Sequence, residues 1–415
     1  MNKVFLLVLA GAIIALKAFA ALEPIAPVGG AVVQLVPDAQ KRVMGCPTQK
    51  ERIRMLVVDR KKDKVLAQDE FWRKAKPFVL EIRATEGENG PWKVMIGKRA
   101  DLSDARTWYI SPIRPDKATG RERTAARTQD VVRIEVPMAN LEIATRYYWK
   151  VVWRGRCGFG CKPKHGCKPS KRRAETLVSE FVTEDFAPRW IELEGKVENV
   201  RDLGGRIGLG GKRVRQGMIY RGQGLNGNSV TGEVQGRNRL TVEDVNYLTG
   251  TLGIKTDLDL RGAGEVAGMH ASPLGESVKF VWRPSSCYRG IFKENGKKSM
   301  AAAFRMFCDR ANYPVYVHCI GGADRTGALA YVLNGVLGVS RQELETDWES
   351  TFYPRIPDES RNANFWCRMS HLVNGFSKYG DVNMPWCDHI VLYLKDCGIT
   401  DDEIATFRNI MLGDK

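Results

Sequence analysis

The feature that most constrains the fold of this 415-residue chain is a cysteine and an arginine separated by five residues, between an apolar run and a helix-like segment. The apolar run spans residues 313–317, and the helix-like segment spans residues 328–337. Between them lies the sequence His318, Cys319, Ile320, Gly321, Gly322, Ala323, Asp324, Arg325, Thr326 and Gly327. This order predicts a strand, a short loop and a helix. The backbone N–H groups of such a loop, with the positive end of the helix dipole behind them, form a concave anion site.

The same positive field favours a cysteine thiolate over a thiol. We therefore interpret Cys319 as a nucleophile toward a bound phosphoryl group. The alternative interpretation is an inert buried cysteine at the end of a core strand. It is disfavoured because the strand, the glycines, the Thr-Gly pair and the helix all stand in register around Cys319.

This spacing, with His318 before the cysteine and Thr326-Gly327 after the arginine, resembles the signature loop of the cysteine-dependent protein tyrosine phosphatases. The resemblance implies that Cys319 attacks phosphorus and carries a thiophosphate intermediate. It implies that Arg325 holds two equatorial oxygens with its planar guanidinium, and that Thr326 donates a hydrogen bond to the departing sulfur. The phosphate-binding residues that it implies are Ile320, Gly321, Gly322, Ala323, Asp324 and Arg325. It requires no metal and no cofactor.

Upstream motifs narrow the resemblance. Residues 199–205 (Asn-Val-Arg-Asp-Leu-Gly-Gly), 219–221 and 252–261, with Glu265, look like the ordered landmarks of the bacterial tyrosine/serine phosphatase family. The match covers residues 190 to 415. Two positions depart from the pattern: Ala323 stands where relatives often have lysine, and Gly222 where they often have serine. Without the lysine the pocket rim has one cation fewer, which weighs against a polyphosphorylated lipid or inositol as substrate.

Expulsion of an alkoxide or phenoxide requires a positioned acid. Four aspartates are candidates, namely Asp324 in the loop, Asp259 and Asp257 at the end of the predicted strand 254–260, and Asp202. In the family that the chain resembles, the loop aspartate is usually considered the general acid. Asp324 is therefore the first candidate for this role and Asp259 the second. For Asp202 and Arg201, a salt-bridged turn closed by Gly204 and Gly205 is at least as good an interpretation.

Three further side chains near these motifs have two interpretations each. His318 is expected to order the Cys319 backbone and to tune the pKa of the thiol, because the loop already supplies the positive field. Arg221 and Arg261 could reach the phosphate. An arginine that ends a strand is, however, more often a solvated or paired surface residue.

The first twenty residues are typical of a signal peptide. Lys3 precedes an apolar stretch from Val4 to Leu16, and Ala18-Phe19-Ala20 forms a small-x-small cleavage site. Thirteen apolar residues are too few to span a bilayer comfortably, although an uncleaved anchor is the alternative. We predict an exported protein, periplasmic or extracellular, with no membrane span after cleavage.

The formal charge of +16 falls to +14 when Lys3 and Lys17 are removed with the signal peptide. Such an excess indicates affinity for polyanions, including a polyanionic polymer at the cell surface. Nucleic acid is not an expected partner outside the cytoplasm. Much of the charge lies in apparent loops, residues 114–127 and 162–173, so solvated loops are the competing explanation.

Ten cysteines in an exported chain predict disulfides. Cys157, Cys161 and Cys167 look like a stapled loop, with Cys46 as a possible fourth partner. His165 lies among them and suggests a metal site instead. That alternative is disfavoured because the paired Cys-x2-Cys arms are missing and the neighbouring lysines repel a dication.

The composition changes near residue 187 and predicts two domains after the signal peptide of residues 1–20. Residues 21–186 contain short alternating β-rich runs separated by turn residues, which predicts an all-β sandwich. In the run 147–153, Tyr147, Trp149, Val151 and Trp153 share one face. The preceding residues 141–147 resemble the tyrosine-corner segment of fibronectin type III domains, so we expect an immunoglobulin-like, fibronectin III-like sandwich.

Residues 187–415 predict an α/β domain of the tyrosine phosphatase type with a central, mainly parallel sheet. The strands 254–260 and 313–318 flank a helix-like segment, 299–308, and should be parallel neighbours. Active loops of such sheets lie beyond the carboxyl ends of the strands, where Cys319 and Asp259 both fall.

The leading hypothesis is an exported phosphomonoesterase with a phosphocysteine intermediate, acting on phosphotyrosine and also on phosphoserine or phosphothreonine if its specificity is dual. One alternative is a phytase-like or phosphoinositide phosphatase built on the same loop. Another is a surface-binding protein whose phosphatase fold is catalytically inactive.

Overall fold

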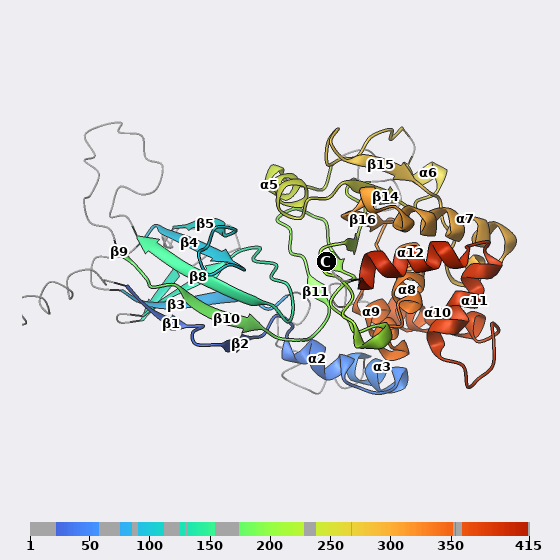
Figure 1. Ribbon diagram of the computed structural model, residues 1–415, viewed down its shortest axis with the longest axis horizontal. Coiled ribbons are helices and arrows are strands. Elements are labelled where there is room, and N and C mark those ends of the chain that lie inside the picture. Colours follow the sequence, from blue (N-terminus) through green and yellow to red (C-terminus); the bar gives the residue numbers. More distant parts are fainter. Residues whose placement is uncertain are drawn as a thin grey trace, which may run out of the picture. The chain divides into compact units, whose positions relative to one another are not determined.

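The computed structural model describes residues 22–57, 75–84, 90–111, 125–128, 131–153, 174–227, 238–266, 268–351, 353 and 359–413. The chain divides into two units (Figure 1). The first comprises Met1–Leu35 and Pro77–Asp185, and the second comprises Val36–Lys76 and Phe186–Lys415. Within the described residues, no helix has both the length and the apolar character needed to cross a membrane. The predicted signal peptide and Cys157, Cys161 and Cys167 lie outside the described residues.

The described part of the first unit is built of strands that form two sheets. One sheet has the order β1-β3-β7-β6, and the other has the order β2-β10-β8-β4-β5, with β9 paired to β8. All pairs are antiparallel except β2 with β10. The strands are β1 (Leu22–Ala26), β2 (Ala31–Val33), β3 (Phe78–Ala84), β4 (Trp92–Gly97), β5 (Arg106–Ile110), β6 (Ala125–Thr128), β7 (Val131–Val136), β8 (Arg146–Trp153), β9 (Ala174–Glu175) and β10 (Ser179–Thr183).

The predicted apolar face of β8 is confirmed, because Tyr147, Trp149, Val151 and Trp153 are all buried. The predicted tyrosine corner is present as well: the backbone N–H of Glu142 donates a 2.9 Å hydrogen bond to the hydroxyl oxygen of Tyr147. The wider likeness to a fibronectin III domain stays a prediction.

One segment departs from the predicted all-β range 21–186. Helices α2 (Asp38–Met44) and α3 (Gln49–Val57) lie there, and both belong to the second unit. Val43 is fully buried in the hydrophobic core of that unit. Arg52 of α3 donates to Glu345 and Glu349, two carboxylates of the second unit. Apolar burial and a buried ion pair therefore bind this segment to the second unit.

The second unit contains a six-stranded sheet of order β11-β12-β13-β16-β14-β15. The strands are β11 (Arg189–Trp190), β12 (Arg201–Asp202), β13 (Ile219–Gly222), β14 (Thr256–Asp259), β15 (Lys279–Trp282) and β16 (Val315–His318). The last four are parallel to one another, and β11 and β12 add an antiparallel edge. The prediction of parallel neighbours is confirmed, with Asp259 opposite His318 in the register of β14 and β16.

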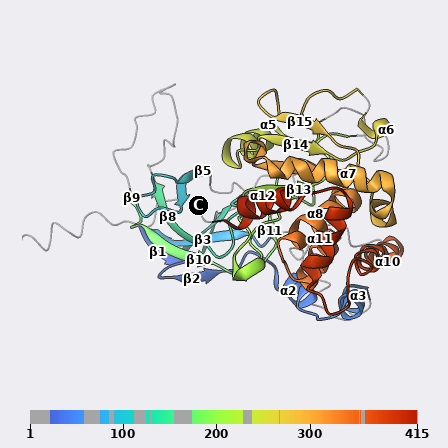
Figure 2. The same cartoon turned by 45° about the vertical axis from the view of Figure 1, so that its right-hand side comes forward.

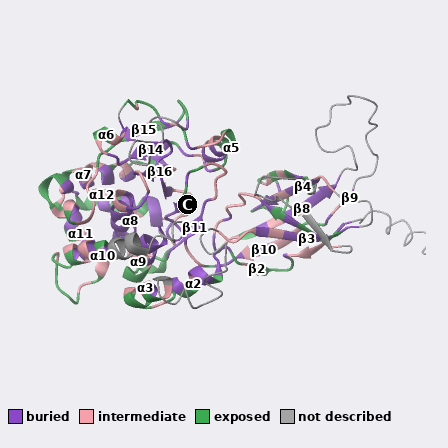
Figure 3. Ribbon diagram, turned by 180° about the vertical axis from the view of Figure 1, so that it is seen from behind, coloured by how far each residue is buried: buried purple, intermediate pink, exposed green. Residues whose placement is uncertain are grey.

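Helices of the second unit pack around α8 (Asp324–Val336), which follows β16. Figure 1 shows α8 among its neighbours α7, α9 and α11, and Figure 2 shows it again beside α11. Every residue of α8 from Thr326 to Val336 is buried, as Figure 3 shows in purple. The other helices are α5 (Val242–Asn246), α6 (Ala263–Val266), α7 (Glu294–Arg305), α9 (Arg341–Ser350), α10 (Glu359–Phe376), α11 (Trp386–Asp396) and α12 (Asp401–Leu412). The core thus fixes α8 so that its first turn meets the end of β16.

Candidate active site

The loop between β16 and α8 has the geometry that the sequence predicts. Cys319 follows the last residue of β16, and α8 begins at Asp324. Gly322 has a φ of +63°, and a Cβ added there would lie 2.2 Å from the carbonyl oxygen of Gly222. Both the dihedral and the space therefore require glycine at this position.

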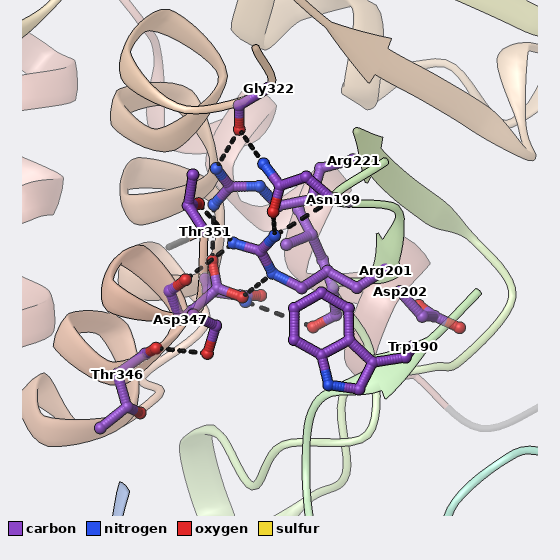
Figure 4. Close-up of polar contacts among 12 residues, drawn as sticks. Trp190, Asn199, Arg201, Asp202, Arg221, Gly322, Thr346, Asp347 and Thr351 are labelled. Atoms are coloured by element: carbon purple, nitrogen blue, oxygen red, sulfur yellow. Dashed lines mark hydrogen bonds and ion pairs between the residues drawn. The ribbon is translucent and has the colours of Figure 1, made fainter. Parts of the chain in front are cut away.

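The carbonyl groups of the loop are bound from behind. The side-chain amide of Asn199 donates to the carbonyl oxygens of Gly321 (3.1 Å) and Gly322 (3.2 Å). Arg221 Nη2 donates to the same Gly322 oxygen at 2.6 Å (Figure 4). Because the C=O and N–H of a peptide unit point in opposite directions, the amides that follow these carbonyls face away from Asn199. They form the cup expected for an anion.

A buried cluster of charges supports these donors (Figure 4). The Asp347 carboxylate of α9 accepts from Arg201 (2.9 Å), Arg206 (3.1 Å) and Arg221 (2.6 Å). Although burial opposes its charge, the three guanidinium groups hold the pKa of Asp347 well below its usual range. Burial and the neighbouring Arg221 lower the pKa of Arg201 to about 9. Three cations around one carboxylate leave a positive field behind the loop.

The electrostatics favour a thiolate at Cys319, whose side chain is buried. Burial alone would raise the pKa of Cys319. The guanidinium of Arg325, the hydroxyl and amide of Thr326 and the amide of Ala323 outweigh burial and lower that pKa below its ordinary value. Within the described residues, the buried Thr326 hydroxyl has no hydrogen-bond partner, so it is available to the neighbouring sulfur.

Arg325 is oriented by a carboxylate of α6. Its Nη2 donates to Glu265 Oε1 at 3.1 Å, and its Nη1 donates to Glu265 Oε2 at 2.5 Å. Burial of Glu265 would raise the pKa of its carboxyl, but the bonds from Arg325 lower it. This two-pronged contact fixes the plane of the guanidinium at the edge of the cup.

His318 lies beneath the cysteine between two carboxylates. One ring nitrogen, Nε2, is 2.9 Å from Asp257 Oδ1, and the other, Nδ1, is 3.2 Å from the Cys319 carbonyl oxygen. Both partners can accept a hydrogen bond, an arrangement that favours the doubly protonated imidazolium. Burial opposes that charge, but Asp259 and Asp257 raise the pKa of His318. As expected, the histidine orders the Cys319 backbone.

Asp259, Asp202 and Arg261 are bound by partners outside the loop. Asp259 is fully buried and bound by Arg261, with Nη2 at 2.6 Å from Oδ2 and Nε at 2.9 Å from the same oxygen. Burial would raise the pKa of Asp259, but His318 and Arg261 lower it. Asp202 accepts from the Gly204 amide at 2.8 Å, as the predicted turn requires. Its ionic partner is Arg189, however, and Arg201 pairs with Asp347 instead.

Asp324 is the first residue of α8 and is partly exposed. It lies close enough to Cys287 to help raise the pKa of that thiol to about 11, after the larger effect of burial. Cys287 belongs to residues 282–289, here called the rim segment, which runs from the end of β15 into a 3-10 turn. The rim segment contains no aspartate or glutamate.

Several supporting residues were not predicted from the sequence. Asn199 heads the Asn-x-Arg-Asp motif, which predicts no function for it, and no sequence pattern points to Asp347 or Arg206 as site residues. Arg221 and Arg201 lie behind the loop rather than at its mouth. The signal for Asn199 was its position at the head of the Asn-x-Arg-Asp motif, and no local pattern marks Asp347.

Free thiols, not disulfides, occur among the described cysteines of the second unit. Cys287, Cys308, Cys319, Cys387 and Cys397 are unbridged, which differs from the predicted disulfides. Cys319 is buried, and the other four thiols are partly buried. Within the described residues, no group of three His, Cys, Asp or Glu side chains could hold a metal ion.

Comparison with known proteins places this site in a family. Residues 191–413, more than half of the chain and all of the site, match the model of a tyrosine phosphatase family. The chain belongs to the tyrosine phosphatase family. A protein of Cupriavidus necator, provisionally named a tyrosine-protein phosphatase, is 28% identical over 225 residues. That alignment covers 47% of this chain and 74% of the relative. The chain is therefore a phosphoric monoester hydrolase of the tyrosine phosphatase type.

Two solved structures show a weak likeness. The core catalytic domain of the PP-IP phosphatase Siw14 of S. cerevisiae matches at 17% identity and a TM-score of 0.24, over 38% of this chain and 90% of that domain. The tyrosine phosphatase OH1 of Orf virus matches at 12% identity and a TM-score of 0.17, over 43% of this chain and 82% of OH1. Scores of this size are too low to carry a conclusion.

Proposed function

We propose that this phosphatase hydrolyses phosphotyrosyl esters through a phosphocysteine intermediate on Cys319. The Cys319 sulfur forms a bond to phosphorus while the bond from phosphorus to the ester oxygen breaks. Arg325 and the loop amides stabilise the charge on the transferring phosphoryl group. Water then cleaves the S–P bond, which releases phosphate and returns the thiolate. The observation that carries the proposal is the unbridged, buried Cys319 in a cup of amides beside Arg325.

Asp324 is the proposed general acid. It gives its proton to the leaving oxygen in the first step, and its carboxylate takes a proton from the attacking water in the second. Among the carboxylates described around the cup, Asp259 is fully buried against Arg261 and Glu265 is bound by Arg325. The rim segment supplies none. Asp324 is the remaining carboxylate of the loop and is partly exposed.

Phosphate release from a small panel tests the assignment. The panel contains a phosphotyrosyl peptide, a phosphoseryl peptide of the same sequence and inositol hexakisphosphate. We expect the phosphotyrosyl peptide to be the best substrate and Cys319→Ser to abolish release. Asp324→Ala should lower kcat by about 10²- to 10⁴-fold on the poor seryl leaving group and much less on an aryl ester with a good leaving group.

Asp259→Ala is the matched comparison for the acid. It removes an internal ion pair, so it should lower activity on all esters by a similar factor. If Asp259→Ala discriminates between leaving groups and Asp324→Ala does not, the two assignments must be exchanged.

Export is proposed from the amino-terminal sequence alone. The proposal is supported by the apolar stretch and the small-x-small site of residues 1–20. Amino-terminal sequencing of the protein made in a bacterial host should give Ala21 as the first residue. An intact Met1 in the purified protein would contradict the proposal.

A further inference from the structure

The rim segment lies at the carboxyl end of the sheet, the end at which Cys319 follows β16. The backbone N–H of Arg283 donates to the Asp259 carbonyl at 2.8 Å, and that of Ser285 donates to the Leu260 carbonyl at 3.2 Å. The chain therefore continues beyond β15 beside the residues that follow β14. Farther along it, the Tyr288 ring packs against the Trp348 ring with 6.1 Å between their centroids, and a Cβ added at Gly327, in the first turn of α8, would meet that Trp348 ring. The rim segment thus lies beside the loop that carries Cys319.

Trp282 begins the rim segment and presents its indole to solvent. It is 40% exposed, and it is the aromatic one among the exposed large apolar side chains described in the second unit. Its Nε1 donates to the Arg261 carbonyl at 2.8 Å. This hydrogen bond fixes the orientation of the exposed ring, so one face of the indole is held ready for contact with another flat group.

The indole rests on the turn that orients the catalytic arginine. Arg261 opens this turn, and the Gly262 amide donates to Glu265 Oε2 at 2.7 Å. Glu265 in turn binds Arg325. Two strand spacings, about 10 Å, separate β15 from β16. The strand between them is β14, and Arg261 follows it. Because the indole Nε1 donates to Arg261, the ring points from β15 toward β14.

A flat apolar group at this position favours aryl esters over alkyl esters. A phosphate held in the cup directs the rest of the ester outward over the rim. An aryl ring can lie against the indole and gain about 3- to 10-fold in binding, whereas a seryl side chain has no ring to offer.

We propose that Trp282 is a specificity-determining residue, whose exposed indole face receives the aromatic ring of a phosphotyrosyl ester bound at Cys319. The inference rests on the proposed function and adds the contact that favours aryl over alkyl esters.

The experiment compares kcat/KM of Trp282→Ala, Trp282→Phe and the wild type on a phosphotyrosyl and a phosphoseryl peptide of the same sequence. Trp282→Ala should lose about 3- to 10-fold on the phosphotyrosyl peptide and less than 2-fold on the phosphoseryl peptide. Trp282→Phe keeps a ring but loses the hydrogen bond to Arg261, and should retain at least half of the preference. Leu392→Ala, which truncates a similarly exposed side chain (38%) on α11, should change neither.

Two outcomes overturn the inference. Equal losses on both peptides in the alanine and phenylalanine variants would show that Trp282 only supports the Arg261–Glu265 turn. An unchanged preference in Trp282→Ala would show that the indole does not touch the substrate.

A binding measurement separates this inference from the proposed function. Calorimetry with phosphotyrosine and phosphoserine uses the Cys319→Ser protein with and without Trp282→Ala. If the wild type hydrolyses no ester but phosphotyrosine binding still weakens 3- to 10-fold without Trp282, the proposed function fails and the Trp282 contact stands. If Cys319→Ser binds neither compound, both are wrong.

Discussion

Substitution of Asn199 is the sharpest test of how the phosphate loop is built. Asn199→Ala removes the amide that donates to the Gly321 and Gly322 carbonyls and the oxygen that accepts from Arg201. Gly322 keeps the bond from Arg221, so the partly buried Gly321 carbonyl loses its side-chain donor, at a cost of about 1–3 kcal/mol. Asn199 also has a φ of +62°, and alanine adds about 1–2 kcal/mol of backbone strain there. We expect the free energy of unfolding to fall by about 2–5 kcal/mol.

Activity should fall as well, because the freed carbonyls no longer hold the amides toward the phosphate. A displacement of about 1 Å costs on the order of 10²-fold in rate. The assays are urea unfolding followed by helical circular dichroism, since the described helices all lie in the second unit, and kcat/KM on a phosphotyrosyl peptide.

Two further variants at the same position separate strain from bonding. Asn199→Gly lacks the strain and should recover part of the stability but none of the activity. Asn199→Asp can still accept from Arg201 but cannot donate to the loop, so it should be stable and slow. A well-folded Asn199→Ala protein with kcat/KM within 2-fold of wild type would refute the claim that Asn199 shapes the loop.

Three other predictions follow from the charges. Because the pKa of Cys319 is lowered, its thiolate persists to lower pH than that of an ordinary thiol, whose pKa is near 8.5; the rate of inactivation by iodoacetate should therefore fall less between pH 9 and pH 7 than the rate of alkylation of free cysteine, and an equal fall would contradict this. Asp347→Asn leaves three guanidiniums around a neutral group and should lower the free energy of unfolding by about 3–5 kcal/mol, which urea unfolding measures; a change below 1 kcal/mol would contradict the buried cluster. Arg52→Met removes the ionic partner of the buried Glu349 and should lower the free energy of unfolding of the second unit by about 3–5 kcal/mol. Arg54→Met, outside that ion pair, should not lower it. Equal effects of the two variants would contradict the assignment of α3 to this unit.

Local patterns allowed the loop and its flanks to be predicted. The apolar run before Cys319 and the helix-like residues after Thr326 gave a strand, a loop and a helix in the observed order. The tyrosine corner at Tyr147 and the turn at Asp202 also follow from short-range features of the sequence. In each case the residues that make the structure lie within about 25 positions of one another.

Long-range contacts could not be predicted in this way. Asp347 is 146 residues from Arg201, and nothing in its own neighbourhood marks it as the acceptor of three arginines. Arg221 was expected at the phosphate or the surface, and only the packing of α9 against the loop shows that it lies behind. The segment 36–57 was assigned to the β-rich unit by position in the chain, but its apolar helix face is buried in the other core.

The central claim is a covalent bond between phosphorus and the sulfur of Cys319. The direct measurement mixes the enzyme with a phosphotyrosyl substrate, quenches with acid within one turnover and maps the labelled peptide by mass spectrometry. The account predicts a phosphate on the peptide that contains Cys319, and none in Cys319→Ser. Phosphate release without any label on Cys319, or with the label on another residue, would contradict it.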